Sequence, residues 1–222
     1  MALEYIDGIR LCRAVTAGLH RVVSRQEYLN KINVFPVPDG DTGTNMAYTL
    51  TSIEEGIKNN AFSDIKRMSM SIADSALDGA RGNSGAILAQ FFVGFSDGIK
   101  DVKRLNTVDF SKAISHAKDY SYDALTKPRE GTILSVIRSW SESIEKSSKT
   151  SKDFLSILSD GLINAQKALE NTPNQLKVLA KAGVLDAGGQ GFVDMLSGIQ
   201  EYIVSGKVTE TELIIIDEIQ QL

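Results

Sequence analysis

The chain has 222 residues, a formal net charge of −4, a hydrophobic fraction of 42% and a charged fraction of 23%. These values are typical of a globular protein with one large or two small domains, and the acidic balance argues against a nucleic-acid surface. The single cysteine, Cys12, excludes an internal disulfide and fits a reducing cytoplasm. We expect no signal peptide and no transmembrane segment, because no basic region precedes an apolar run and no apolar run approaches about 18 residues.

Apolar residues recur at helical spacing along almost the whole chain and predict eight main helices. The first covers about 3–28 and the second about 43–58, and the others begin after 59–60, near 83, after 107, near 131–132, near 151 and near 188. The connection 171–187 is long enough for a short helical turn. Mostly short links predict an all-α, eight-helix antiparallel barrel or bundle over residues 1–205. Residues 206–222, with the β-branched run Leu213–Ile216, form a tail or begin a following domain.

Alternate helices of an antiparallel bundle begin at the same end. The even-numbered helices all open with glycine-containing segments, whereas the odd-numbered ones open at ordinary polar positions. These openings are 39–45, 82–85, 129–132 and 186–191. Four helix N-termini at one end would form an anion-attracting surface, and carboxylates among them imply a bridging cation. The sequence therefore predicts a nucleotide site at one end of the bundle.

The most informative opening is Asn33-Val-Phe-Pro-Val-Pro-Asp39-Gly-Asp41-Thr-Gly-Thr-Asn-Met46. Asp39 and Asp41 are candidate Mg²⁺ ligands that would also serve catalysis; the alternative is an ordinary turn and helix cap. An EF-hand is excluded, because the fifth and twelfth positions counted from Asp39 are glycine and leucine. Asn33 is either a further metal ligand or an ordinary residue at a helix C-terminus.

The remaining openings offer hydroxyls, backbone N–H groups and cations. None matches a Gly-x-Gly-x-x-Gly or Walker-type loop, and neither histidine lies in a catalytic or zinc motif. Arg81, Lys127 and Arg129 are candidates for the cation that meets the transition state, although a lone surface arginine such as Arg81 is more often simply solvated. The candidate nucleotide-binding residues are Thr42, Gly43, Thr44, Asn45, Gly82, Asn83, Ser84, Gly85, Thr132, Asp186, Ala187 and Gly188.

These segments together resemble the nucleotide-binding L subunit of dihydroxyacetone kinases, and more narrowly the N-terminal domain of bacterial fatty acid kinases. The match rests on the segments 33–46, 79–85, 127–132 and 183–191 and covers about residues 1–205. It implies an eight-helix barrel with ATP at one end and two Mg²⁺ ions between aspartates and phosphates. Two departures from the family pattern stand out. Where the kinase subunit has a third aspartate, this chain has Asn33, and it has one residue more between that position and Asp39. The arginine that the kinase subunit places near the nucleotide base has no clear equivalent between Asn171 and Gly183.

The resemblance implies a kinase domain in the cytoplasm that phosphorylates a fatty acid carboxylate held by a separate fatty-acid-binding protein. The remaining domains of a longer kinase would be further partners, and a homodimer stays open. Two alternatives also stay open. One is a kinase for dihydroxyacetone or a similar small hydroxyl substrate, and the other is a nucleotide-sensing module without turnover.

Overall fold

The computed structural model describes residues 2–58 and 61–205. Apart from one antiparallel bridge between Ile6 and Leu105, these residues form helices, turns and loops, which confirms the all-α prediction. Eight helices are long and three are short within the described part of the chain. Their bounds are α1 Gly8–Ser24, α2 Gln26–Lys31, α3 Thr42–Lys58, α4 Ile65–Asp78, α5 Gly82–Gly98, α6 Thr107–Asp123, α7 Ile133–Ser148, α8 Phe154–Glu170, α9 Thr172–Gln175, α10 Lys177–Ala182 and α11 Ala187–Ser205.

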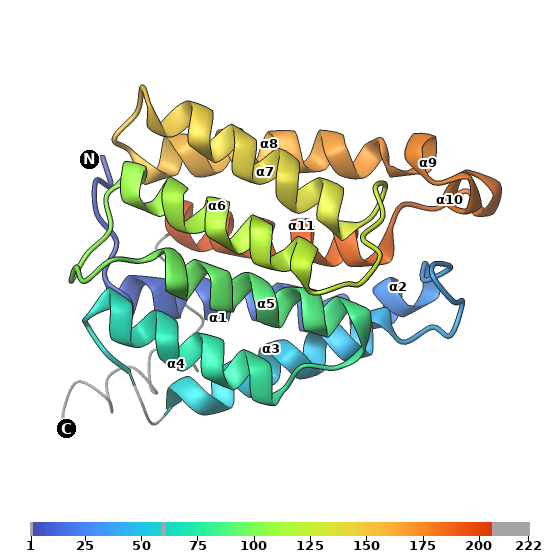
Figure 1. The fold of residues 1–222 in the computed structure, drawn as a ribbon, viewed down its shortest axis with the longest axis horizontal. Coiled ribbons are helices and arrows are strands. Elements are labelled where there is room, and N and C mark those ends of the chain that lie inside the picture. The colour runs from blue at the N-terminus through green and yellow to red at the C-terminus, as the bar shows by residue number, and fades with distance from the viewer. Residues whose placement is uncertain (1, 59–60, 206–222) are drawn as a thin grey trace.

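The eight long helices form a closed ring. From α3 to α8 each packs against the next along the chain, α11 packs against α8 and α1, and α1 packs against α3 and α4. Short polar caps set several helix starts: the side chains of Asp64, Asn106 and Asp153 each accept a backbone N–H from the first turn of the helix that follows. The short helices α2, α9 and α10 project at one end of the barrel (Figure 1).

Two parts of the expected helix pattern differ from the structure. The single helix over 3–28 is wrong, because the side chain of Asp7 accepts a hydrogen bond from the backbone N–H of Arg10 (2.9 Å) and starts α1 at Gly8. The chain then breaks at Arg25, and α2 follows as a separate helix. The connection 171–187 contains two short helices, α9 and α10, rather than one turn. The run Leu213–Ile216 lies outside the described residues.

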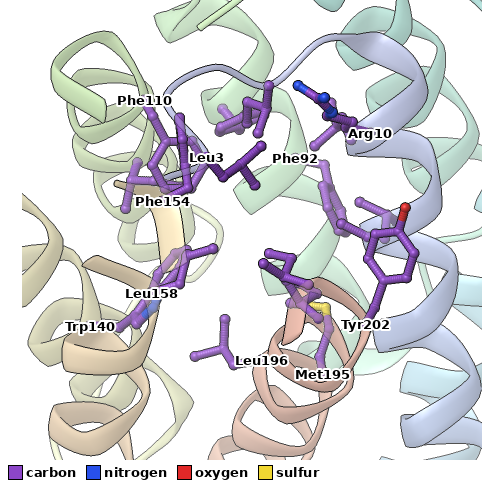
Figure 2. A pocket seen from close by; sticks show the side chains of 18 of the residues that line it. Leu3, Arg10, Phe92, Phe110, Trp140, Phe154, Leu158, Met195, Leu196 and Tyr202 are labelled. Carbon is purple, nitrogen blue, oxygen red and sulfur yellow. The ribbon is translucent and has the colours of Figure 1, made fainter. Parts of the chain in front are cut away.

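The barrel interior holds an aromatic cluster, with ring centroids 5.3–6.4 Å apart for the contacting pairs. The cluster consists of Phe91, Phe92, Phe95, Phe110, Trp140, Phe154 and Phe192. Beside it lies a cavity of about 250 Å³ whose lining is almost entirely apolar, with Arg10 and Tyr202 as polar exceptions (Figure 2). None of the candidate site residues lines this cavity. Within the described residues, no helix combines the length and apolar character that crossing a bilayer requires.

Candidate functional site

The starts of α3, α5, α7 and α11 meet around one pocket of about 420 Å³. This pocket lies at the barrel end from which α2, α9 and α10 project (Figure 1). Six of the candidate nucleotide-binding residues line it, together with two of the candidate cations and several apolar side chains. The lining residues are Phe35, Pro36, Thr42, Asn83, Ser84, Ile87, Leu125, Lys127, Arg129, Thr132, Ile133, Leu176, Asp186 and Gly188.

The acidic loop before α3 is held by one buried amide. The Nδ2 group of Asn33 donates hydrogen bonds to the carbonyl of Val37 (2.8 Å) and to Oδ1 of Asp39 (3.1 Å), and its Oδ1 accepts one from the hydroxyl of Thr42. Asn33 itself is only 5% exposed, whereas Asp39 and Asp41 are both exposed. Gly40 between the aspartates has φ of +69°, a left-handed conformation that few residues other than glycine adopt. The loop thus presents two carboxylates to solvent on a fixed turn.

The first turn of α3 is secured from α2. The carbonyl of Asp41 accepts the backbone N–H of Asn45 (2.8 Å), so Asp41 lies directly before the first residue of the helix, Thr42. Oδ1 of Asn30 accepts the N–H of Thr44 (3.0 Å), and its Nδ2 donates to the Thr44 hydroxyl (2.9 Å). A Cβ on Gly43 would lie 2.2 Å from the carbonyl oxygen of Gln26, so this glycine lets α2 and α3 pack closely. Gly43 and Thr44 therefore serve the α2–α3 contact in this structure and do not line the pocket.

The start of α5 leaves backbone N–H groups available to a ligand. Its cap residue, Arg81, makes no side-chain capping hydrogen bond, and Asn83 and Ser84 line the pocket directly. Gly82 has φ of +58°, and a Cβ there would lie 2.4 Å from Nδ2 of Asn45. This contact places Asn45 beside the α5 opening, behind the residues that line the pocket. An uncapped first turn is where an anion would find N–H donors and the positive end of the helix dipole.

Gly85 and Ala187 are buried next to the pocket without lining it. A Cβ on Gly85 would lie 2.5 Å from Oγ1 of Thr49, so Gly85 permits close packing of α5 on α3. Gly85 therefore supports the site through packing in this structure.

The segment before α7 supplies two cations to the pocket. Lys127 and Arg129 line it, both are exposed, and neither forms an ion pair within the described part of the chain. Thr132 caps α7 and donates its hydroxyl to the carbonyl of Arg129 (2.7 Å), which fixes the path of the segment. Arg81 differs from these two, because its guanidinium stacks on the ring of Tyr48 at 3.4 Å from the centroid and does not line the pocket.

Asp186 is the buried acid of the pocket, with 5% of its surface exposed. Its Oδ2 accepts the N–H of Gly189 at 2.7 Å, which caps α11, and the N–H of Ile133 also hydrogen-bonds to this carboxyl. Burial raises the pKa of Asp186 to about 6 from the usual 3.8, against the opposing effect of these two hydrogen bonds. The carboxyl thus joins the starts of α7 and α11, and its ionised form is disfavoured by desolvation.

No group of three His, Cys, Asp or Glu side chains that could hold a metal occurs in the described residues, so a divalent ion bound by Asp39 and Asp41 would need further oxygen ligands of another kind. The metal and nucleotide roles of these and the other candidate residues stay predictions. The apolar part of the lining was not predicted from the sequence. Leu176 reaches the pocket from the turn between α9 and α10, and Phe35 and Pro36 reach it from the acidic loop. In the sequence, only the Val-Phe-Pro-Val-Pro segment at 34–38 indicated that apolar residues lie beside the acidic loop.

A family model described as the DAK2 domain matches residues 36–201. The chain belongs to the DAK2 domain family. An uncharacterized protein of Staphylococcus saprophyticus is 37% identical over 193 residues, and one of Staphylococcus aureus is 34% identical over 206 residues. These matches cover 87% and 93% of the chain but only 35% and 38% of the relatives, so this DAK2 domain spans about a third of their length.

The fold is also found in solved structures. The native dihydroxyacetone kinase of C. freundii superposes with a TM-score of 0.64 at 18% identity, over 86% of this chain and 34% of that one. A complex of a C. freundii dihydroxyacetone kinase with AMP-PNP and Mg²⁺ gives a TM-score of 0.63 at 17% identity, over 86% and 33% of the two chains. At this level of identity the likeness establishes the barrel fold of the DAK2 domain.

Proposed function

We propose that this DAK2 domain binds ATP with Mg²⁺ at the pocket where α3, α5, α7 and α11 begin. The observation that carries the proposal is this convergence of four helix starts with an exposed acidic loop and two cations, Lys127 and Arg129, that form no ion pair with any described residue. Helix N-termini and cations favour phosphate, and carboxylates beside phosphate require a cation between them. The neighbour with AMP-PNP and Mg²⁺ has the same fold, which supports the choice of ligand.

The residues present fit each part of this ligand. The uncapped N–H groups at Asn83 and Ser84, together with Lys127 and Arg129, suit the triphosphate. The apolar side chains of Ile87, Leu125, Ile133 and Leu176 suit the base. Asp39 and Asp41 would hold Mg²⁺, and we propose two ions as the resemblance implies. Mg²⁺ held there would offset the negative charge of the phosphate groups.

We propose further that the acceptor is a fatty acid carboxylate presented by a separate fatty-acid-binding protein, which gives an acyl phosphate. A carboxylate is ionised at neutral pH, so the protein needs no general base to activate it. The chain's task would then be positioning and charge neutralisation, as in other phosphoryl transfers. The other domains of a longer protein would dock the partner, consistent with the share of the relatives that this domain spans. Such an enzyme would act in the cytoplasm.

A second candidate acceptor is dihydroxyacetone or another small hydroxyl compound. The specific observation that favours it is the dihydroxyacetone kinase activity named for both structural neighbours. A hydroxyl acceptor must lose a proton during transfer and so needs a base near the phosphate. Asp186, a buried acid with a raised pKa that lines the pocket, is the candidate for this base.

A third candidate is a non-catalytic nucleotide sensor, which would bind the same ligand without any turnover.

The test begins with calorimetric titration of AMP-PNP, with and without Mg²⁺, into the domain. We expect Mg²⁺-dependent binding that Asp39→Ala and Asp41→Ala each abolish, while helicity measured by circular dichroism is unchanged. Near-normal binding by Asp39→Ala would refute the metal assignment.

The acceptor requires the longer protein, reconstituted with ATP and each candidate. Transfer only to a fatty acid on its carrier protein supports the lead proposal, and transfer only to dihydroxyacetone supports the second. Tight binding with no turnover for any acceptor would favour the sensor.

A further inference from the structure

Amide side chains from α2 and the residues just after it contact the acidic loop and the start of α3. Gln26 and Asn30 lie one turn apart on α2, and Asn33 lies two residues after the last residue of α2, Lys31. Nε2 of Gln26 and Nδ2 of Asn30 both donate to the hydroxyl of Thr44, at 3.2 and 2.9 Å. Together with the hydrogen bonds of Asn33 described above, these contacts form what we call the amide ladder: Gln26, Asn30 and Asn33.

The amide ladder holds both ends of the acidic loop: Asn33 hydrogen-bonds to the loop itself, and Gln26 and Asn30 hydrogen-bond to Thr44, three residues after Asp41. Between residues 34 and 41 no residue is buried, so apolar packing contributes little to the shape of this segment. The two buried residues that flank it are Asn33, which donates to Val37 and Asp39, and Thr42, whose hydroxyl donates to Asn33. The loop conformation therefore depends on hydrogen bonds from one side.

The short helix α2 is itself firmly seated. Leu29 is fully buried, and Gly43 lets the backbone of α3 approach α2 closely. At its start, Nε of Arg25 donates to Oδ2 of Asp194 on α11 at 2.8 Å, and the Asp194 side chain is only 7% exposed. A helix of this length would not be stable alone, so these contacts are what make it a rigid support.

We propose that Gln26, Asn30 and Asn33 are positioning residues that hold the carboxylates of Asp39 and Asp41 in their ligand-binding arrangement before Mg²⁺ and nucleotide arrive. This inference rests on the proposed function. An ordered loop lowers the conformational cost of binding, so the amide ladder increases affinity without touching the ligand. In this arrangement Asn33 holds the loop through both Nδ2 and Oδ1 of its side chain. Its role as a direct metal ligand stays a prediction.

Asn30 is the residue to change, because its side chain contacts neither Asp39 nor Asp41 and hydrogen-bonds to Thr44. Asn30→Ala removes both hydrogen bonds to Thr44, and the control is Asn106→Ala. Asn106 starts α6 with the same two-way pattern: its Oδ1 accepts the N–H of Asp109 (2.8 Å) and its Nδ2 donates to the Asp109 carboxylate (3.0 Å). Asn106 lies outside the pocket, so both variants lose a comparable helix cap and only one affects the loop.

We expect Asn30→Ala to weaken Mg²⁺-dependent AMP-PNP binding about tenfold, because the loop must then be ordered when the ligand binds, and Asn106→Ala to leave binding unchanged. Binding of AMP-PNP in EDTA should change less than twofold in either variant. Asn30→Asp should restore binding to within about twofold, because its carboxylate still accepts the Thr44 N–H. Amide hydrogen exchange over residues 37–44 of the free protein should accelerate about tenfold in Asn30→Ala alone.

The inference is overturned if Asn30→Ala binds AMP-PNP with Mg²⁺ like Asn106→Ala, or if loop exchange is unchanged. If Asn30→Ala does not fold, Gln26→Ala, which removes one of the two donors to Thr44, should still weaken binding about threefold, and no change there also overturns it. Failure of the unaltered protein to bind AMP-PNP with Mg²⁺ would instead refute the proposed function, so the two failures are distinguishable.

Discussion

Asp186→Asn should stabilise the free protein at neutral pH, which is unusual for a substitution in a buried site. The amide oxygen of asparagine can still accept the N–H of Gly189 and cap α11, but it carries no charge to desolvate. Burial raises the pKa of Asp186 from 3.8 to about 6, so the folded state binds this proton more tightly than the unfolded state. The carboxyl therefore contributes stability below pH 3.8 that is lost as pH rises through about 6.

The size of the effect follows from the same two values. Each pKa unit is worth about 1.4 kcal/mol, so complete ionisation of Asp186 costs the folded state roughly 3 kcal/mol. At pH 7.5 the free energy of unfolding of the asparagine variant should exceed that of the unaltered protein by up to that amount. For a chain of this size this corresponds to a rise in Tm of about 6–12 °C. Near pH 4 the two proteins should have nearly equal free energies of unfolding.

Urea denaturation from pH 4 to pH 7.5 measures this difference directly, because the other titrating groups are common to both proteins and cancel. The difference in free energy of unfolding should grow with pH and level off above about pH 7. Parallel stability profiles for the two proteins would refute the reasoning, since they would mean that the folded structure does not raise the pKa of Asp186.

Three further predictions follow from the site and the core. Lys127→Ala and Arg129→Ala should each weaken AMP-PNP·Mg²⁺ binding about tenfold by calorimetry, whereas Arg81→Ala, whose guanidinium stacks on a tyrosine, should change it less than threefold. Gly43→Ala should destabilise the fold by about 1–3 kcal/mol in urea, because its Cβ would meet the α2 backbone at 2.2 Å. Phe154→Ala should cost about 3–5 kcal/mol of stability because the ring is fully buried, yet leave nucleotide affinity within twofold at temperatures where the variant is folded.

Much of the helical framework was predictable because its signals are local. Asn106 and Asp153 cap α6 and α8 within three residues of the predicted starts, and apolar spacing continues from there. The connectivity alone predicted that the four glycine-containing openings meet at one end of the barrel, because short links force neighbouring helices to run in opposite directions. The pocket that these openings line bears out that geometric step.

The break between α1 and α2 was not predictable, because its cause is distant in sequence. Residues 3–28 have a continuous helical pattern, and Arg25 is a good helix former. In the structure Arg25 pairs with Asp194, which lies 169 positions away, and α2 begins at the next residue. The helical spacing of apolar residues carries no information about such a distant contact. The same limit applies to Leu176, which lines the pocket from a connection that lacks a strong pattern.

The two cavities divide the barrel into ends that substitutions can affect separately. On helix α5 the pocket at the helix starts is lined as far as Ile87 and the apolar cavity from Phe91 onward, so at 1.5 Å per residue the two linings are about 6 Å apart along the helix. Helix α11 likewise contributes Gly188 to the pocket at the helix starts and Ile203 to the apolar cavity. A single substitution at the apolar end should therefore change nucleotide binding only by destabilising the whole fold. The comparison of Phe154→Ala with Lys127→Ala tests this directly, because only the second should weaken binding in a protein of normal stability.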